Sequence, residues 1–227
     1  MKMQKLITFL VFLLLSITCV SARADVLVLV HGYLSGADSW EASGINSLLE
    51  ANGWKRGGLI TSAPATIAPV LIGPGKDAEN KVYTVDLPAD APIVVQTDQF
   101  LGMLATIQAL HPGENLVIAG HSAGGIVARN ALVIGNVPNV KALITIASPH
   151  IGTTLANRAI DATDESGFFG GIKSFFGGSD YDTLRRSRGL LFDLAHPYPG
   201  SLLYWLNMQK HPDSQYVSVI RLNPAGL

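Results

Sequence analysis

One serine of the sequence stands where it could act as a nucleophile. Gly120, Ser122 and Gly124 form a G-x-S-x-G pattern between an apolar run at 116–119 and a segment of helical character. A chain that turns from strand to helix in so little space strains the serine at the tip, and side chains at the two glycines would collide with the neighbouring elements. The helix N-terminus beneath the serine favours negative charge. The pattern therefore predicts covalent catalysis by Ser122.

A second segment could stabilise the oxyanion that such an attack produces. His31-Gly32-Tyr33 directly follows the apolar run 26–30. In a parallel sheet, the end of this strand lies at the same edge as Ser122. The N–H of Ala123, the residue after the serine, can supply one hydrogen-bond donor, and the N–H of Tyr33 can supply the other. We therefore expect an oxyanion hole formed by Tyr33 and Ala123.

The alternation of elements predicts the sheet that these segments need. Strands are expected at 26–30, 82–86, 116–119, 140–147 and 216–222, and helices at 41–52, 97–110, 122–134 and 201–210. Asp38 and Glu41 have the spacing of a capping box ahead of the first helix. Residues 57–80 show no helical period and are expected to be irregular, apart from a short strand at 70–72. Strands alternating with helices indicate an α/β fold, with a mostly parallel sheet flanked by helices.

One segment interrupts this alternation. Residues 151–200 are rich in glycine and contain the pairs Phe168-Phe169 and Phe175-Phe176. We expect an insertion here. Its phenylalanines either form a glycine-hinged flap that opens at a lipid surface, or pack the insertion onto the rest of the domain.

Three segments of the chain resemble the α/β-hydrolase superfamily on its lipase and esterase branch: residues 28–33 (VLVHGY), 120–125 (GHSAGG) and 146–153 (IASPHIGT). The last is also similar to a segment of lipase-like deacylases that act on glycolipid anchors. The resemblance spans most of residues 26–222. It implies an α/β-hydrolase fold with Ser122 as nucleophile, the backbones of Tyr33 and Ala123 as oxyanion hole, and 151–200 as cap or lid. It also implies a carboxylic ester substrate with an acyl or lipid group, although amide or thioester cleavage stays open, and no cofactor.

The resemblance further implies a catalytic acid and then a histidine, both after the strand that follows the cap. That strand is expected at 216–222, yet neither an acidic residue nor a histidine follows Asp213. Three explanations stay open. The chain is C-terminally truncated and lacks its last strand; or the base is His196 near Asp193, or His211 with Asp213; or the protein is a binding relative of the hydrolases without turnover.

The first 24 residues have the features of a secretory signal. Lys2 and Lys5 precede an apolar run at 6–20, and Ala22-Arg23-Ala24 resembles a cleavage site. We therefore expect a signal peptide at 1–24, one α/β-hydrolase domain at 25–227, and export to the periplasm or the medium. The single cysteine, Cys19, lies inside the signal, so we expect neither a disulfide nor thiol chemistry in the exported part.

The net charge and the spacing of the histidines argue against nucleic acid and a catalytic metal as partners. The chain has 16 basic and 17 acidic residues, and loss of Lys2, Lys5 and Arg23 with the signal would leave 13 basic ones. Such a mildly acidic chain is not expected to bind nucleic acid. No pair of histidines has the spacing of metal ligands, so we expect no catalytic metal. The expected partners are a small-molecule or lipid ester and, through the cap, a transiently contacted membrane surface.

Overall fold

The computed structural model describes residues 25–62, 69–73, 80–164 and 181–220. The predicted signal peptide, the paired phenylalanines and residues 221–227 lie outside the described residues. The strands are β1 (Asp25–Val30), β2 (Lys55–Ser62), β3 (Pro69–Ile72), β4 (Lys81–Asp86), β5 (Asn115–His121), β6 (Val140–Ile146) and β7 (Gln215–Val219). The helices are α2 (Ser39–Ala42), α3 (Ile45–Ala51), α4 (Ile93–Leu110), α5 (Ala123–Gly135), α6 (Thr154–Asp164), α7 (Tyr181–Arg186), α8 (Arg188–Leu194) and α9 (Leu202–Met208).

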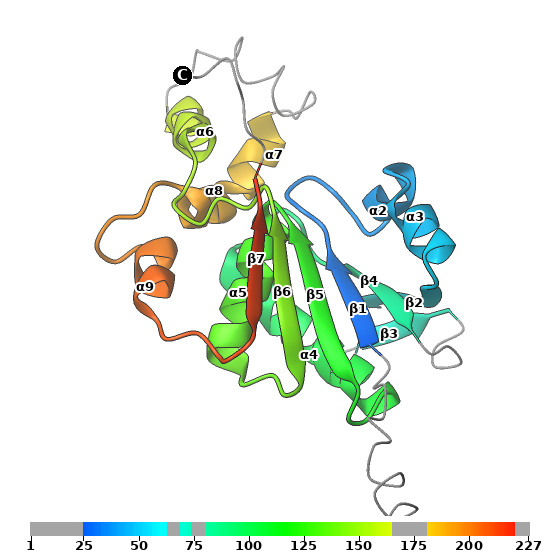
Figure 1. Ribbon diagram of the computed structural model, residues 1–227. Helices are drawn as coiled ribbons and strands as arrows, with labels where there is room; N and C mark the ends of the chain where they lie inside the picture. Colours follow the sequence, from blue (N-terminus) through cyan, green and yellow to red (C-terminus); the bar gives the residue numbers. More distant parts are fainter. Residues whose placement is uncertain (1–24, 63–68, 74–79, 165–180, 221–227) are drawn as a thin grey trace, which may run out of the picture.

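The described strands form one seven-stranded sheet in the order β3-β2-β4-β1-β5-β6-β7 (Figure 1). Each neighbouring pair is parallel except β2 and β3, which are antiparallel. The predicted α/β fold with a mostly parallel sheet is thus confirmed. In the register of the central strand β1, Val30 pairs with Val85 on one side and Gly120 on the other. The loops after β1 and β5 therefore leave the same edge of the sheet side by side.

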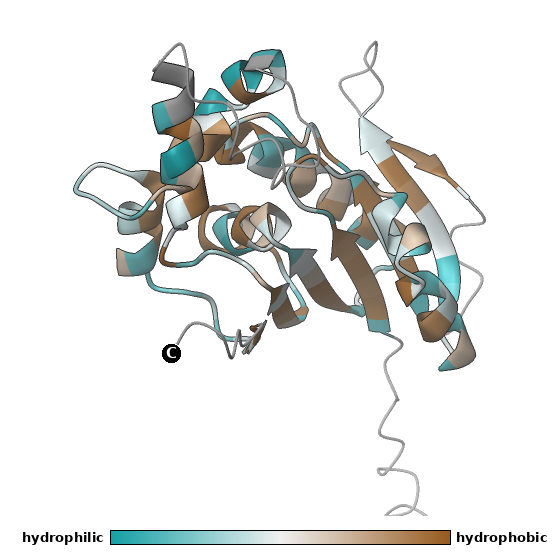
Figure 2. Cartoon of the chain, turned by 90° about the horizontal axis from the view of Figure 1, so that it is seen from above, coloured by the Kyte–Doolittle hydropathy of each residue, from teal (hydrophilic) through white to brown (hydrophobic). Residues whose placement is uncertain are grey.

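The sheet is covered by helices on both faces, and β1 shows why its sequence is apolar throughout. Val26, Val28 and Val30 belong to a core that also contains buried residues of α4 and α5. Leu27 and Leu29 point to the other face, where they pack in a smaller cluster with Trp40 of α2. Figure 2 shows the central strands as the most hydrophobic layer, between these helices. A strand buried on both faces has no polar alternation.

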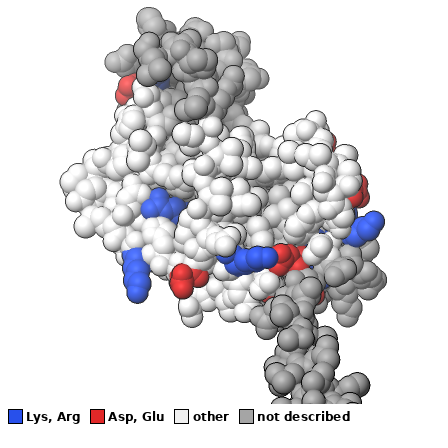
Figure 3. All heavy atoms as spheres, in the orientation of Figure 1, with Lys and Arg blue, Asp and Glu red and all other residues white. Residues whose placement is uncertain are grey.

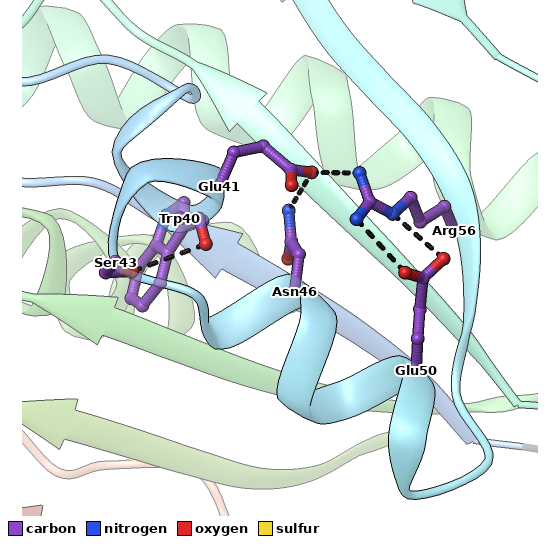
Figure 4. Close-up of polar contacts among 6 residues, drawn as sticks. All are labelled: Trp40, Glu41, Ser43, Asn46, Glu50 and Arg56. Atoms are coloured by element: carbon purple, nitrogen blue, oxygen red, sulfur yellow. Dashed lines mark hydrogen bonds and ion pairs between the residues drawn. The ribbon is translucent and has the colours of Figure 1, made fainter.

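The prediction of one continuous helix over 41–52 is wrong, because the chain forms two short helices there, α2 and α3. Gly44 separates them with a left-handed φ of 75°, a conformation that interrupts a helix. The predicted capping box does not form, since the Asp38 side chain makes no capping hydrogen bond. The Glu41 carboxylate instead accepts from Asn46 Nδ2 at 2.6 Å and pairs with Arg56 (Figure 4). Glu41 is thus bound to α3 and β2 and does not close a cap at the start of α2.

Strand β2 was not expected, because residues 57–80 show no helical period and were expected to be irregular apart from 70–72. Glycine stands at position 57 because β2 lies very close to a side chain of β4. A methyl group on Gly57 would lie 2.5 Å from Cζ of Tyr83. The Tyr83 ring occupies the space that a side chain of β2 would fill. The register also shifts between Arg56 and Gly58, as in a β-bulge. The short strand predicted at 70–72 is confirmed as β3.

The remaining elements agree with expectation apart from their ends. Helix α4 begins at Ile93, four residues before the predicted start at 97. The last predicted strand, 216–222, is observed as β7 over Gln215–Val219, and all of its residues are exposed. Helices α6 to α9 lie between β6 and β7, where the insertion and the helix 201–210 were expected. No helix in the described part of the chain is long and apolar enough to cross a membrane.

Candidate active site

Ser122 occupies the tip of the turn between β5 and α5. Its φ of 52° and ψ of −123° are unusual for a residue with a side chain. Its N–H donates to the carbonyl of Ile146 on β6 at 2.8 Å, which fixes the turn to the sheet. The two glycines are required: a methyl group on Gly120 would lie 2.6 Å from Cα of Gly125, and one on Gly124 would lie 2.7 Å from the Val30 carbonyl oxygen. The backbone of Ser122 therefore has the strained conformation that the G-x-S-x-G pattern predicts.

The loop after β1 passes directly beside Ser122. A methyl group on Gly32 would lie 3.0 Å from Ser122 Cβ, closer than side chains usually approach. His31 fixes this loop: its Nδ1 lies 3.0 Å from the Gly32 carbonyl oxygen, and its Nε2 accepts from the N–H of Leu87 at 3.0 Å. His31 is 2% exposed, and its ring, as an acceptor at Nε2, carries its proton on Nδ1. His31 thus holds the loop in place.

The two predicted oxyanion donors flank this contact. Ala123 is the first residue of α5 and is 1% exposed, and an N–H in the first turn of a helix has no partner within the helix. Tyr33 follows Gly32, and its side chain packs against the main core. Burial raises the pKa of the Tyr33 phenol, and the nearby Ser187 opposes this shift. Since Ser187 lies between α7 and α8, the inserted helices pack onto the predicted oxyanion loop.

The structure gives His196 and Asp193 separate partners. His196 Nδ1 lies 3.2 Å from the Ile151 carbonyl oxygen, and its Nε2 lies 3.3 Å from Thr154 Oγ1. Asp193 Oδ2 accepts from the N–H of Ile93 at 2.8 Å, at the start of α4. Burial raises the pKa of Asp193, and this backbone hydrogen bond opposes the shift. An acid–base pair of these two residues, one of the alternatives left open by the sequence, is therefore not observed.

His211 is also engaged elsewhere. Its Nε2 accepts from Nε of Arg129 at 2.8 Å, and its Nδ1 lies 2.9 Å from the Gln209 carbonyl oxygen. It precedes β7, and β7 runs parallel to β6, so His211 and Asp213 lie toward the amino end of the strands. Ser122 follows the carboxyl end of β5. This placement argues against His211 as the base for Ser122.

Among the described residues, none of the histidine rings forms a hydrogen bond with Ser122. His111 bonds to the Tyr83 hydroxyl at 2.7 Å, and His150 lies 3.0 Å from Thr145 Oγ1. His121 precedes the serine, and a methyl group on Gly32 would lie 3.2 Å from its Nδ1; desolvation lowers the pKa of its ring. In the same described part of the chain, no three His, Cys, Asp or Glu side chains are placed to hold a metal ion.

One polar cluster, centred on Arg129 of α5, was not predicted from the sequence. Arg129 contacts His211, His150 and Asn207, which come from three different segments. Isolated residues so far apart in the chain form no motif, so only the packed structure could bring them together.

Known proteins share this architecture. A family model described as alpha/beta hydrolase fold matches residues 25–178. Bacillus licheniformis lipase BlEst2 in mature form matches with a TM-score of 0.60 and 19% identity over 87% of this chain and 65% of the lipase. The product of gene lin2722 from Listeria innocua matches with a TM-score of 0.50 and 14% identity over 85% of this chain and 97% of that protein. Phospholipase PlaB from Legionella pneumophila matches with a TM-score of 0.51 and 16% identity over 81% of this chain and 35% of the phospholipase.

These similarities define the fold. The chain spans less than two thirds of the lipase BlEst2, and at identities below 20% a shared fold does not transfer an activity. No curated protein matches the chain. The family match covers more than half of the chain and includes the turn at Ser122. The chain belongs to the α/β-hydrolase fold family.

Proposed function

We propose that this protein is a serine hydrolase that cleaves carboxylic esters through an acyl-enzyme on Ser122. The observation that carries the proposal is the strained backbone of Ser122 at the tip between β5 and α5, directly against Gly32. A residue in such a conformation costs on the order of 1–3 kcal/mol, and strain of this kind clusters at active sites. Glycine at position 122 would avoid this cost, so a serine there argues for use of its hydroxyl.

The chemistry follows from the geometry of the turn. Ser122 Oγ attacks the ester carbonyl carbon, and the electron pair of the C=O double bond moves onto its oxygen. The N–H groups of Ala123 and Tyr33 stabilise this oxyanion. The proton that the Ser122 hydroxyl loses passes to the leaving oxygen as the double bond re-forms and the alcohol departs. Water then attacks the acyl-serine, a proton of that water returns to Ser122 Oγ, and the carboxylic acid is released. We do not assign the general base to any histidine whose ring bonds to a residue other than Ser122. These histidines are His31, His111, His150, His196 and His211.

Esters of acyl chains or lipids are the substrate class that we propose. Apolar side chains are exposed on the inserted segment, where Ile151 is 75% exposed and Tyr198 is open to solvent, and on the following helix α9, where Met208 is 69% exposed and Trp205 is open to solvent. Such groups favour contact with an acyl chain or with a lipid surface. Two of the similar structures are a lipase and a phospholipase, which supports the same class. The basic, apolar and small-residue pattern of 1–24 supports export of the protein.

A fluorophosphonate probe tests the proposal directly. Incubation of the full chain with the probe should give a covalent adduct on the peptide that contains Ser122, detected by mass spectrometry. The Ser122→Ala variant should give none, while the variant Ser39→Ala, at a serine whose hydroxyl donates to the Gly36 carbonyl, should label like the wild type. Absence of the adduct from the wild-type chain, or an adduct on another serine, would contradict the proposal.

A second candidate is a hydrolase-fold binding protein without turnover. The observation in its favour is that the described histidines bond to partners other than Ser122. It predicts that short-chain p-nitrophenyl esters bind to the protein, are not hydrolysed, and leave no acyl group on Ser122. Release of p-nitrophenol that disappears in Ser122→Ala decides for the hydrolase.

A further inference from the structure

A cavity of about 430 Å³ lies over the face of β6 and β7, beside α5 and α9. Its size falls in the range of small-molecule sites. The cavity is lined by Arg129, Leu143, Thr145, His150, Ile151, Asn207, His211, Tyr216, Val217 and Ser218. No aspartate or glutamate is among these lining residues, and most side chains over α9 and β7 are uncharged in Figure 3.

Arg129 carries the positive charge of this cavity, and its partners are all neutral. Its Nε donates to His211 Nε2 at 2.8 Å, and its Nη1 donates to Asn207 Oδ1 at 2.7 Å and lies 3.4 Å from His150 Nδ1. Its Nη2 donates to the Leu206 carbonyl at 3.3 Å. Within the described residues no carboxylate forms an ion pair with it. A half-buried guanidinium stays charged, and a buried charge is stable only when it is compensated.

The two imidazoles strengthen the case for an incoming anion. Each accepts a hydrogen bond from Arg129, so each is neutral and carries its proton on the other nitrogen. His150 Nε2 then donates to Thr145 Oγ1 at 3.0 Å, and His211 Nδ1 donates to the Gln209 carbonyl at 2.9 Å. Burial first, and then the charge of Arg129, lower the pKa of both rings. The cluster therefore carries the positive charge of Arg129 beside an open space whose lining residues include no carboxylate.

We propose that this cavity binds the carboxylate or phosphate group of a small amphiphile. The anionic group lies against the Arg129 guanidinium, within reach of the Thr145 and Ser218 hydroxyls. The apolar part of the ligand packs on Leu143, Ile151 and Val217, which line the same space. This site is separate from Ser122 and does not depend on the proposed hydrolase activity.

If Arg129 only connected neighbouring elements, as a structural bridge, the cavity would be expected to behave differently toward ligands. The guanidinium does connect α5 to α9 and to the segment before β7. A bridge requires no ligand and has no preference between an anion and a neutral molecule of the same length. The cavity beside the guanidinium, free of acidic residues, is what a bridge does not explain.

Calorimetric titration of the Ser122→Ala chain tests the proposal without hydrolysis. Octanoate and octyl phosphate should bind at least about tenfold more tightly than octanol or octylamine, because a hydrogen bond to a charged group adds about one factor of ten or more. Inorganic phosphate is the third anion. Saturable binding of phosphate that depends on Arg129 supports a site for a free anion, and binding of the alkyl anions alone supports a site for an amphiphile.

Arg129→Gln should weaken the binding of octanoate at least about tenfold, whereas Arg56→Gln removes an exposed arginine on β2 and should leave it unchanged. Because Arg129→Gln could unfold the chain, the second readout uses Arg129 intact. Octanoate should raise the pH midpoints of the His150 and His211 ring resonances in NMR spectra. Equal affinity for octanol and octanoate, or histidine resonances that octanoate leaves unmoved, would overturn the proposal.

Discussion

The carboxylate of Asp193 on α8 accepts a hydrogen bond of 2.8 Å from the backbone N–H of Ile93, the first residue of α4. The two residues are 100 positions apart in the sequence. Pro92, at the N-cap position of α4, has no side-chain acceptor of its own. The inserted helices therefore supply the cap that α4 lacks locally, and they tie its first turn to α8.

Asp193→Ala should lower the free energy of unfolding by about 1 kcal/mol, the usual effect of losing a helix cap. The expected loss of stability comes from the hydrogen bond between the Asp193 carboxylate of α8 and the Ile93 N–H of α4. Urea denaturation followed by circular dichroism measures it. Asp98→Ala, at an exposed position inside α4, should change stability by less than about 0.5 kcal/mol. Equal effects of the two substitutions would rule out the capping role.

Ser122→Gly should increase the free energy of unfolding by about 1 kcal/mol while abolishing labelling by the fluorophosphonate. Glycine adopts a positive φ without steric cost, and this gain exceeds its larger loss of backbone entropy. Ser122→Ala keeps the strain and should have wild-type stability. Ala147→Gly is the matched control, since Ala147 also has a positive φ, of 50°; it should gain stability and keep labelling. The prediction fails if the glycine and alanine variants at 122 unfold at the same urea concentration.

Gly32→Ala should reduce kcat/KM for p-nitrophenyl butyrate on the order of 100-fold, as loss of one oxyanion donor does. The added methyl group would lie 3.0 Å from Ser122 Cβ and 3.2 Å from the His121 carbonyl oxygen, so the loop that carries Tyr33 must shift. Gly102→Ala, inside α4 with its nearest neighbour at 3.6 Å, should keep the rate and add about 0.5–1 kcal/mol of stability. Wild-type turnover by Gly32→Ala would remove this loop from the site.

The stability of the protein should fall as pH drops below about 6.5, the ordinary pKa of histidine. The folded-state pKa values of His150 and His211 are lowered, by burial and then by Arg129, and Tyr216 lies close to Arg129. The unfolded chain therefore binds protons first on acidification, and stability that is present above pH 6.5 is lost as pH falls toward the folded-state values.

Denaturation midpoints at pH 7.5 and pH 5.5 measure this dependence. The double variant His150→Gln/His211→Gln should lose less stability between the two pH values, because glutamine still offers Arg129 an acceptor and does not titrate. His196→Gln, at a ring without contact to Arg129, should behave like the wild type. A double variant with the full pH dependence of the wild type would assign the effect to other groups.

Local sequence predicted those parts of the fold that depend on neighbouring residues. The turn around Ser122 was predictable because its tight strand-to-helix spacing is local, and a side chain on Gly120 would collide with Gly124 and Gly125. The contact between His31 Nδ1 and the carbonyl oxygen of the adjacent Gly32, at 3.0 Å, is local in the same way.

The elements that were missed depend on distant residues. Strand β2 carries glycine at 57 because a ring of β4 covers it, and α4 starts four residues early because Asp193 caps it. The Arg129 cluster joins α5, α9 and the two loops that flank the inserted helices, so no window of sequence contains it. The break between α2 and α3 was not predicted, because it depends on the left-handed φ of Gly44 and not on the type of the neighbouring residues.

The central position of β1 also governs the order in which the chain can fold. Its residues pair with β4, which begins at Lys81, and with β5, which ends at His121. During synthesis from the N-terminus, the Val-Leu strand at 26–30 therefore stays without any neighbour until β4 is complete at Asp86, and without its second neighbour until β5 is complete at His121, when more than half of the chain has been made. Pairings of such large sequence separation are slow to form, and a bare β-branched segment is prone to pair with other chains. The early ribosome-bound protein is thus the species in which we expect the greatest need for a chaperone.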